Sequence, residues 1–169
     1  MDELWSALQD STDEPAPGPL VLGVPWNCPA SLAMTAARLA AALDLHLICA
    51  YVDPSSYLVE WSPASGLLAE SLDPAVNEEA AYPASMVLER LESILGPAGT
   101  EWSFRVLNGS VSAALTRLAQ STGASMLVVG GQRPGLLPRL GRILEGSVAE
   151  DLGRVQSRPV VVVPARRSG

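Results

Sequence analysis

Five short runs rich in apolar residues recur along the chain, and stretches with helical spacing separate them. Most of these runs are almost continuously apolar, which is typical of parallel strands that are covered on both faces. In the third run apolar and polar residues alternate, which indicates a strand nearer an edge of the sheet. The five runs are Leu20–Val24, Leu45–Val52, Trp102–Leu107, Met126–Val129 and Pro159–Val163.

This alternation predicts an α/β fold with one five-stranded parallel sheet, doubly wound, with helices on both of its faces. Parallel strands need long crossover connections, and right-handed helical crossovers cover the sheet. The segment from Tyr57 to Tyr82 has a weaker pattern interrupted by prolines, which predicts a long irregular loop with at most one helical turn. The expected helices run from about Pro29 to Leu43, Pro83 to Leu95, Val111 to Gln120 and Ser147 to Val155.

Length and composition predict one domain. The 169 residues are 48% hydrophobic and 17% charged, which is enough for one substantial core and short for two. Residues 1–18 are expected to form an N-terminal arm, with a short helix over Met1 to Asp10 and then a proline-rich linker. Residues 19–165 would be the α/β domain, and residues 166–169 a C-terminal tail.

Charge and residue types exclude several classes of function. A net charge of −7 argues against a nucleic-acid-binding protein, which needs a basic face. We expect no membrane association and a cytoplasmic location, because no apolar stretch is long enough to span a bilayer and the first residues are acidic. All basic residues are arginines, which excludes a Walker A loop, and one histidine with two separated cysteines makes a zinc site unlikely to form.

The carboxyl edge of the predicted sheet is the expected ligand site, because ligands of open α/β sheets bind outside the carboxyl ends of the strands, where the strand order switches. A glycine pair, Gly130 and Gly131, follows one strand there, and Gly146-Ser147 precedes a helix. These residues can form a phosphate cradle of backbone N–H groups, or they can be ordinary turn and helix-cap residues. The arginines Arg133, Arg139 and Arg142 allow the same two interpretations, phosphate recognition or a solvated basic loop.

The turn after the first strand also belongs to this edge. Trp26 can stack on a base, or it can fill the pocket in place of a ligand, and we favour the second interpretation because Pro25 precedes it. Asn27 or Cys28 is placed to cap the following helix, and Cys28 is expected to be a packing residue rather than a redox-sensitive thiol. Asp53 can hold a metal-bound phosphate or close the turn after its strand. His46 is interpreted as a hydrogen-bonded structural residue.

From Leu20 to Pro164 the chain resembles the universal stress protein family. The resemblance rests on the order of elements, on Asp53-Pro54 after the second strand, and on two segments, Val128 to Gly130 and Gly146 to Pro164. It implies an adenine nucleotide alpha hydrolase-like fold, a site for ATP or AMP with Mg²⁺, a role in stress response, and a homodimer formed through Val160–Val163.

The sequence departs from the family pattern at two points of that site. Arg133 stands where ATP-binding members have a second glycine, and Pro25 aligns with an aspartate that commonly faces the adenine. Proline offers neither a side-chain acceptor nor a backbone N–H, so it cannot make that contact.

Two hypotheses follow. The first is a domain that binds an adenine nucleotide at the carboxyl edge, with at most slow ATP hydrolysis and no catalytic residue assigned. The alternative is a dimeric adaptor that binds no nucleotide and whose pocket is occluded by Pro25 and Trp26. The candidate nucleotide-binding residues are Val24, Pro25, Trp26, Tyr51, Val129, Gly130, Gly131, Arg133, Gly146, Ser147 and Val148.

Overall fold

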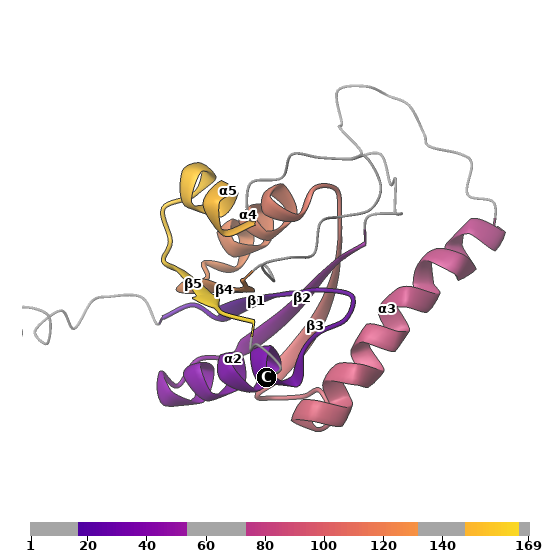
Figure 1. The fold of residues 1–169 in the computed structure, drawn as a ribbon, viewed down its shortest axis with the longest axis horizontal. Coiled ribbons are helices and arrows are strands. Elements are labelled where there is room, and N and C mark those ends of the chain that lie inside the picture. Colours follow the sequence, from indigo (N-terminus) through magenta and orange to yellow (C-terminus); the bar gives the residue numbers. More distant parts are fainter. Residues whose placement is uncertain (1–16, 54–73, 132–147, 166–169) are drawn as a thin grey trace, which may run out of the picture.

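The fold was analysed in a computed structural model that describes residues 17–53, 74–131 and 148–165, and only the backbone of residues 74–83. Helices and strands alternate strictly along these residues (Figure 1). The elements are β1 (Leu20–Val24), α2 (Ala30–Ala42), β2 (Leu47–Asp53), α3 (Pro74–Leu95), β3 (Trp102–Asn108), α4 (Val111–Thr122), β4 (Met126–Gly130), α5 (Val148–Val155) and β5 (Val160–Val163).

The strands form one five-stranded sheet in the order β3-β2-β1-β4-β5, and every neighbouring pair is parallel. The predicted fold class is therefore confirmed. β3 lies at one edge of the sheet, as its alternating sequence indicated, and β5 lies at the other. The chain first builds outward from β1 to β3 and then returns to build from β4 to β5, so the strand order switches between β1 and β4.

Each face of the sheet has its own core. Helices α2 and α3 cover one face and α4 and α5 the other (Figure 1). Because successive strand residues point to opposite faces, neighbours along β2 divide between the cores: Cys49 and Tyr51 pack toward α2 and α3, whereas Ile48 and Ala50 pack toward α4. Gly23 allows α4 to approach closely, since a Cβ there would lie 2.9 Å from a methyl carbon of Leu115.

The structure corrects the predicted start of the third crossover helix. Helix α3 begins at Pro74, not at Pro83, so the last part of the segment predicted to be an irregular loop is helical. The helical apolar spacing is clear only after Pro83, and proline is disfavoured in a helix interior, so the sequence predicts the later start. Helix α3 contains Pro83 in its interior instead.

The ends of α2 also differ from the prediction. Its N-cap residue is Pro29 rather than Asn27 or Cys28, and no side chain caps this end. At the other end, the N–H of Asp44 donates to Ala41 and the N–H of Leu45 to Ala40, which is the hydrogen-bond pattern of a Schellman motif. This closing turn uses Asp44 and Leu45, so β2 begins at Leu47 rather than at Leu45.

Candidate functional site

The strand order switches between β1 and β4, and in open α/β sheets a ligand crevice is expected outside the carboxyl ends of the two strands that flank such a switch. The two strands are in register from Leu20–Met126 to Leu22–Val128. Beyond that pair β1 continues to Val24, which pairs with β2, and β4 continues to Gly130, which pairs with β5. The two strands therefore part over their last residues, and the backbone that lines this gap is where a ligand can approach.

Gly130 and Gly131 differ in what their amides do. The N–H of Gly131 donates to the carbonyl of Val163 at 2.8 Å. The N–H of Leu127 donates in the same direction, to the carbonyl of Pro159 directly before β5. Because amides of alternate strand residues point to opposite neighbours, the N–H of Gly130 points to the β1 side, where the pairing has ended. Of the two interpretations of the glycine pair, this hydrogen bond favours an ordinary structural role for the Gly131 amide, whereas the Gly130 amide is directed toward the gap between β1 and β4.

Trp26 and Pro25 lie exposed on the other side of this crevice, at the end of β1. The Trp26 side chain is 53% exposed, the largest aromatic surface that the described residues offer to solvent. A side chain exposed to this extent does not fill a buried pocket, so the structure favours the stacking interpretation of Trp26 over the filling interpretation.

The N-terminus of α2 opens onto the same edge. No side chain caps it, and its first turn contains no acidic residue. The amides of Leu32 and Ala33 bond back to the carbonyl of Pro29, which leaves the first helical amides directed at the crevice. The positive end of the helix dipole favours an anion here.

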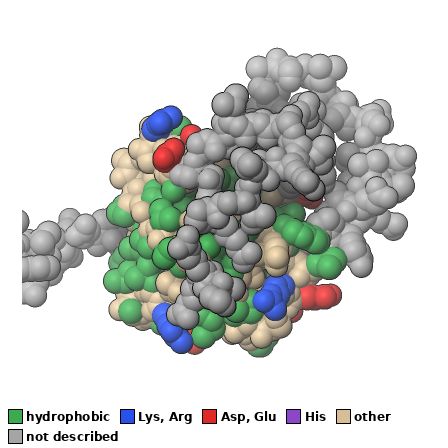
Figure 2. Space-filling model, viewed as in Figure 1, with side chains coloured by type: hydrophobic (Ala, Val, Ile, Leu, Met, Phe, Trp, Pro, Cys, Tyr) green, Lys and Arg blue, Asp and Glu red, His purple; other side chains and the backbone are tan. Residues whose placement is uncertain are grey.

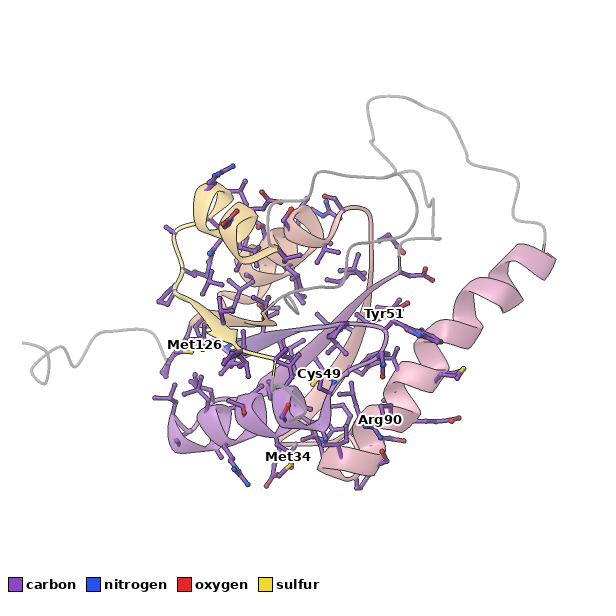
Figure 3. All side chains as sticks on the ribbon, viewed as in Figure 1. Met34, Cys49, Tyr51, Arg90 and Met126 are labelled. Atoms are coloured by element: carbon purple, nitrogen blue, oxygen red, sulfur yellow. The ribbon has the colours of Figure 1, made fainter. Side chains whose placement is uncertain are left out.

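Tyr51 and Asp53 supply buried polar groups at the end of β2. Tyr51 is 5% and Asp53 3% exposed. Figure 3 shows Tyr51 on the side of the sheet that faces α3. Burial raises the pKa of Tyr51, and the negative charge of Asp53 raises it further. Because its side chain is buried, Tyr51 can border a ligand at this edge only through its backbone.

Cys28 is a packing residue, as expected. Its side chain is fully buried in the core under α2, and its thiol lies 3.7 Å from the carbonyl oxygen of Pro29. Burial raises its pKa to about 11 although the positive charge of Arg90 acts in the opposite direction. A thiol of this kind stays protonated at neutral pH and is a poor nucleophile.

The remaining candidates divide between the core and segments outside the described residues. Val24 and Val129 are buried core residues, and Val148 packs partly buried against the core between the sheet, α4 and α5. Acidic Glu150 and Asp151 follow Val148 in the first turn of α5, where they stabilise the helix and weaken its attraction for an anion. Arg133, Arg139, Arg142, Gly146 and Ser147 lie outside the described residues.

The parallel sheet, its strand order and the helices on both faces define a doubly wound α/β domain. The model of the universal stress protein family matches residues 25–164, most of the chain. The chain therefore belongs to the universal stress protein family. A comparison with curated protein sequences found no match.

Solved structures of this family share the fold. A universal stress protein in complex with cAMP is 25% identical with a TM-score of 0.59, and the match covers 88% of this chain and 98% of that one. One from Archaeoglobus fulgidus in complex with dAMP is 18% identical with a TM-score of 0.52, covering 86% and 96%. UspA from Lactobacillus plantarum is 19% identical with a TM-score of 0.55, covering 88% and 99%.

Among residues 17–53, 74–131 and 148–165, no helix is both long and apolar enough to cross a membrane. No cluster of three or more histidine, cysteine, aspartate or glutamate side chains in that part of the chain has the arrangement of a metal site.

Proposed function

We propose that this chain binds an adenine nucleotide, ATP or AMP with Mg²⁺, at the carboxyl edge of its sheet, and that it acts in stress response in the cytoplasm. The observation that carries the proposal is that β1 and β4 stop pairing at the carboxyl edge, beside the uncapped start of α2 and the exposed Trp26 side chain. Family membership and the cAMP complex of a 25% identical relative support it.

The groups at this crevice suit the two halves of a nucleotide. Backbone amides and the positive end of α2 attract phosphate oxygens, while an indole ring can stack on a base. In the proposed site Arg133, Gly146, Ser147 and Val148 complete the phosphate end. Pro25 borders the base with its exposed ring, and Val24, Tyr51 and Val129 border it with their backbone.

Calorimetric titration of the purified protein with ATP, AMP and cAMP, with and without Mg²⁺, tests the proposal. A ligand that binds only the native state also raises the melting temperature by mass action. We expect saturable binding of at least one adenine nucleotide and a matching thermal shift. Absence of both at millimolar nucleotide would refute the proposal, provided that mass spectrometry finds no nucleotide already bound to the purified protein.

A second candidate is a dimeric adaptor that binds no nucleotide. The observation that favours it is the edge strand β5, whose apolar residues include the 46% exposed Val162 and which pairs within the described chain only with β4. An apolar edge strand of this kind is a template for pairing with another chain. In this proposal two copies join through Val160–Val163, and residues 19–165 act as one folded unit.

A further inference from the structure

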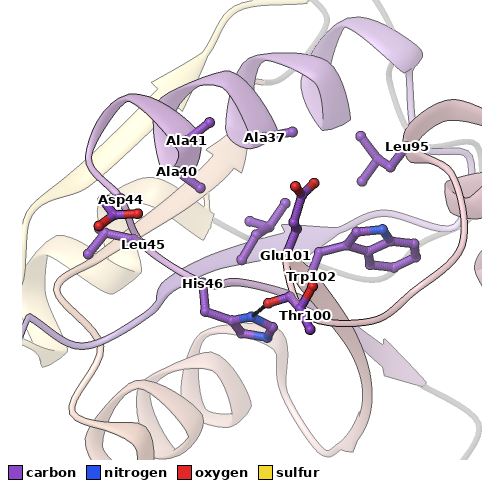
Figure 4. A pocket seen from close by; sticks show the side chains of 11 residues that line it. Ala37, Ala40, Ala41, Asp44, Leu45, His46, Leu95, Thr100, Glu101 and Trp102 are labelled. Carbon is purple, nitrogen blue, oxygen red and sulfur yellow. Dashed lines mark hydrogen bonds between the residues drawn. The ribbon is translucent and has the colours of Figure 1, made fainter.

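A cavity lies at the opposite, amino edge of the sheet, away from the nucleotide crevice. Its volume is about 440 Å³, within the range of small-molecule sites. It lies between the C-terminal ends of α2 and α3 and the first residues of β2 and β3 (Figure 4). The lining residues are Ala37, Ala40, Ala41, Asp44, Leu45, His46, Leu47, Leu95, Thr100, Glu101 and Trp102.

Charged side chains at this cavity are all acidic. Asp44 and Glu101 are exposed to solvent, and the lining contains no arginine that would neutralise them. Figure 4 shows the Glu101 carboxylate between α2 and the Trp102 ring. In a chain with a net charge of −7, this lining attracts cations and repels anions.

Two helix dipoles add to the negative potential. Helices α2 and α3 both end at the cavity, where Ala41 of α2 and Leu95 of α3 form part of its wall. The C-terminal end of a helix carries a partial negative charge that basic residues in the last turn usually offset. Neither helix has a basic residue in its last turn. The field of both helix ends therefore adds to the attraction of Asp44 and Glu101, which lie on opposite sides of the cavity in Figure 4, for a cation.

Trp102 provides the independent sign of a ligand. The side chain is only 4% exposed, and its indole N–H has no hydrogen-bond acceptor among the described residues. A buried N–H without a partner is energetically unfavourable, because its lost hydrogen bonds to water are not replaced. In Figure 4 the indole nitrogen lies on the edge of the ring that faces Leu95, across the wall of the cavity. A ligand oxygen that reaches this edge would satisfy the N–H, and the indole ring itself attracts cations.

His46 restricts the kind of cation that fits. Its Nδ1 lies 2.9 Å from the carbonyl oxygen of Thr100 and its Nε2 lies 2.9 Å from the hydroxyl oxygen of Ser103. The carbonyl can only accept, so Nδ1 donates to it and Nε2 pairs with the hydroxyl. Because both ring nitrogens are engaged, His46 forms a fixed wall and supplies no lone pair to a metal ion. A small organic cation with an apolar body fits the remaining lining better than a metal does.

We propose that this amino-edge cavity binds a small organic ammonium compound that also carries an oxygen acceptor, such as an amino alcohol. The ammonium group lies between Glu101 and the indole ring, within the field of Asp44 across the cavity. The alanines of α2 and Leu95 contact its methyl or methylene groups, and its oxygen accepts from the Trp102 N–H. The site is distinct from the proposed nucleotide crevice and does not depend on it.

Calorimetry with choline as the probe tests this site, together with fluorine NMR of fluorotryptophan-labelled protein. The chain has four tryptophans, and the Trp102→Phe variant identifies the Trp102 signal. We expect one choline per chain, a dissociation constant in the millimolar range and a shift of the Trp102 signal. The neutral isostere of choline, with carbon in place of the ammonium nitrogen, should not bind. Equal binding of that isostere would overturn the proposal.

Variants separate the contributions of charge and hydrogen bonding. Glu101→Gln and Asp44→Asn should each weaken choline binding by about threefold to tenfold, whereas Glu89→Gln, an exposed change on α3 outside the lining, should leave it unchanged. Trp102→Phe should reduce choline binding to the level of tetramethylammonium, which has no oxygen. Unchanged choline binding in both acidic variants, or displacement of choline by stoichiometric Mg²⁺, would overturn the proposal.

Discussion

At the scale of single residues, Trp26 distinguishes the two proposed functions. One function predicts that Trp26→Ala lowers the affinity for nucleotide, and the other predicts that it raises that affinity. If Trp26 stacks on a base, the variant loses about 1–3 kcal/mol of binding free energy, which weakens nucleotide affinity about tenfold or more. If Trp26 instead occludes the pocket of an adaptor, the variant gains nucleotide binding. Calorimetry with ATP distinguishes the two outcomes.

The control for this experiment is Val106→Ala, which removes another exposed apolar side chain, 47% exposed on β3. Both positions are exposed, so we expect stability changes within about 0.5 kcal/mol in each variant. A Trp26→Ala variant with the affinity of the parent protein, with Val106→Ala also unchanged, would contradict a role for Trp26 in either function.

The two buried thiols predict how stability depends on pH. Burial raises the pKa of Cys28 to about 11 and that of Cys49 to about 12, from an ordinary value of 9.0. A pKa that is higher in the folded state means that stability is fully present below the ordinary pKa and is lost as the pH rises through the folded pKa. Each thiol should therefore cost about 1 kcal/mol of stability by about pH 10.

Urea unfolding between neutral pH and about pH 10 measures this loss. The chain has no lysine, so cysteine and tyrosine are the main side chains that titrate in this range. Buried Tyr51 contributes with the same sign, because its pKa is also raised. A Cys28→Ala/Cys49→Ala variant should be less stable at neutral pH but lose less stability toward high pH. A variant with the parent's slope would show that these thiols do not cause the loss.

At the scale of elements, the C-terminal end of α2 contains a residue that two local rules disfavour. Asp44 occupies the left-handed position of the closing turn, with φ of 54°, where glycine is usual. It also puts a negative charge at the negative end of the helix dipole. Asp44→Gly should therefore raise the free energy of unfolding by about 1 kcal/mol, and Asp44→Asn by about half of that.

Thermal and urea unfolding of both variants measure this effect. The control is Asp151→Asn in the first turn of α5, where a negative charge is favourable, so this variant should be less stable than the parent protein. Asp44→Gly and Asp44→Asn both less stable than the parent would mean that the carboxylate stabilises the turn. We expect the Asp44 variants to be more stable than the parent protein but to bind choline less well. This combination would mean that Asp44 is retained for binding although it destabilises the turn.

Sequence periodicity predicted the elements well where burial alone determines the pattern. The strands around β1, β4 and β5 were placed to within about one residue because apolar runs with turn residues at both ends leave little choice. The start of α3 was wrong because two prolines were equally suited to a first helical turn, and local propensity cannot choose between them. The start of β2 was wrong because a Schellman turn formed without glycine, and its sequence signal is weak.

At the scale of the whole molecule, the sequence predicted a parallel sheet with a ligand edge but not which backbone groups face that edge. Gly130 and Gly131 look equivalent as a glycine pair, yet pairing with β5 uses the amide of one and not that of the other. The amino-edge cavity was not predicted at all, because Asp44, Glu101 and Trp102 come together only when α2, β2 and β3 assemble. An aspartate directly after an alanine-rich helix, where glycine is expected, was the one local signal.

Strand β5 forms one edge of the sheet and can pair with a second copy of the chain. Hydrophobic side chains predominate on the described surface where Figure 1 places β5 and α2 (Figure 2). The carbonyl oxygens of Pro159 and Val163 accept from β4, so by alternation Val160 and Val162 direct their backbone groups away from β4, toward the free edge. If two copies pair through β5, these outward groups form the hydrogen bonds between the chains.

Val162→Pro is the sharpest test of that dimer, because it removes one outward N–H without removing a hydrogen bond to β4, and proline is tolerated on edge strands. Sedimentation at micromolar concentration should show a dimer for the parent protein and a folded monomer for Val162→Pro. Val162→Ala, which keeps the N–H and loses only apolar bulk, should remain largely dimeric. A monomeric parent protein, or a dimer that survives Val162→Pro, would exclude pairing through this edge, since backbone hydrogen bonds supply much of the free energy of strand addition.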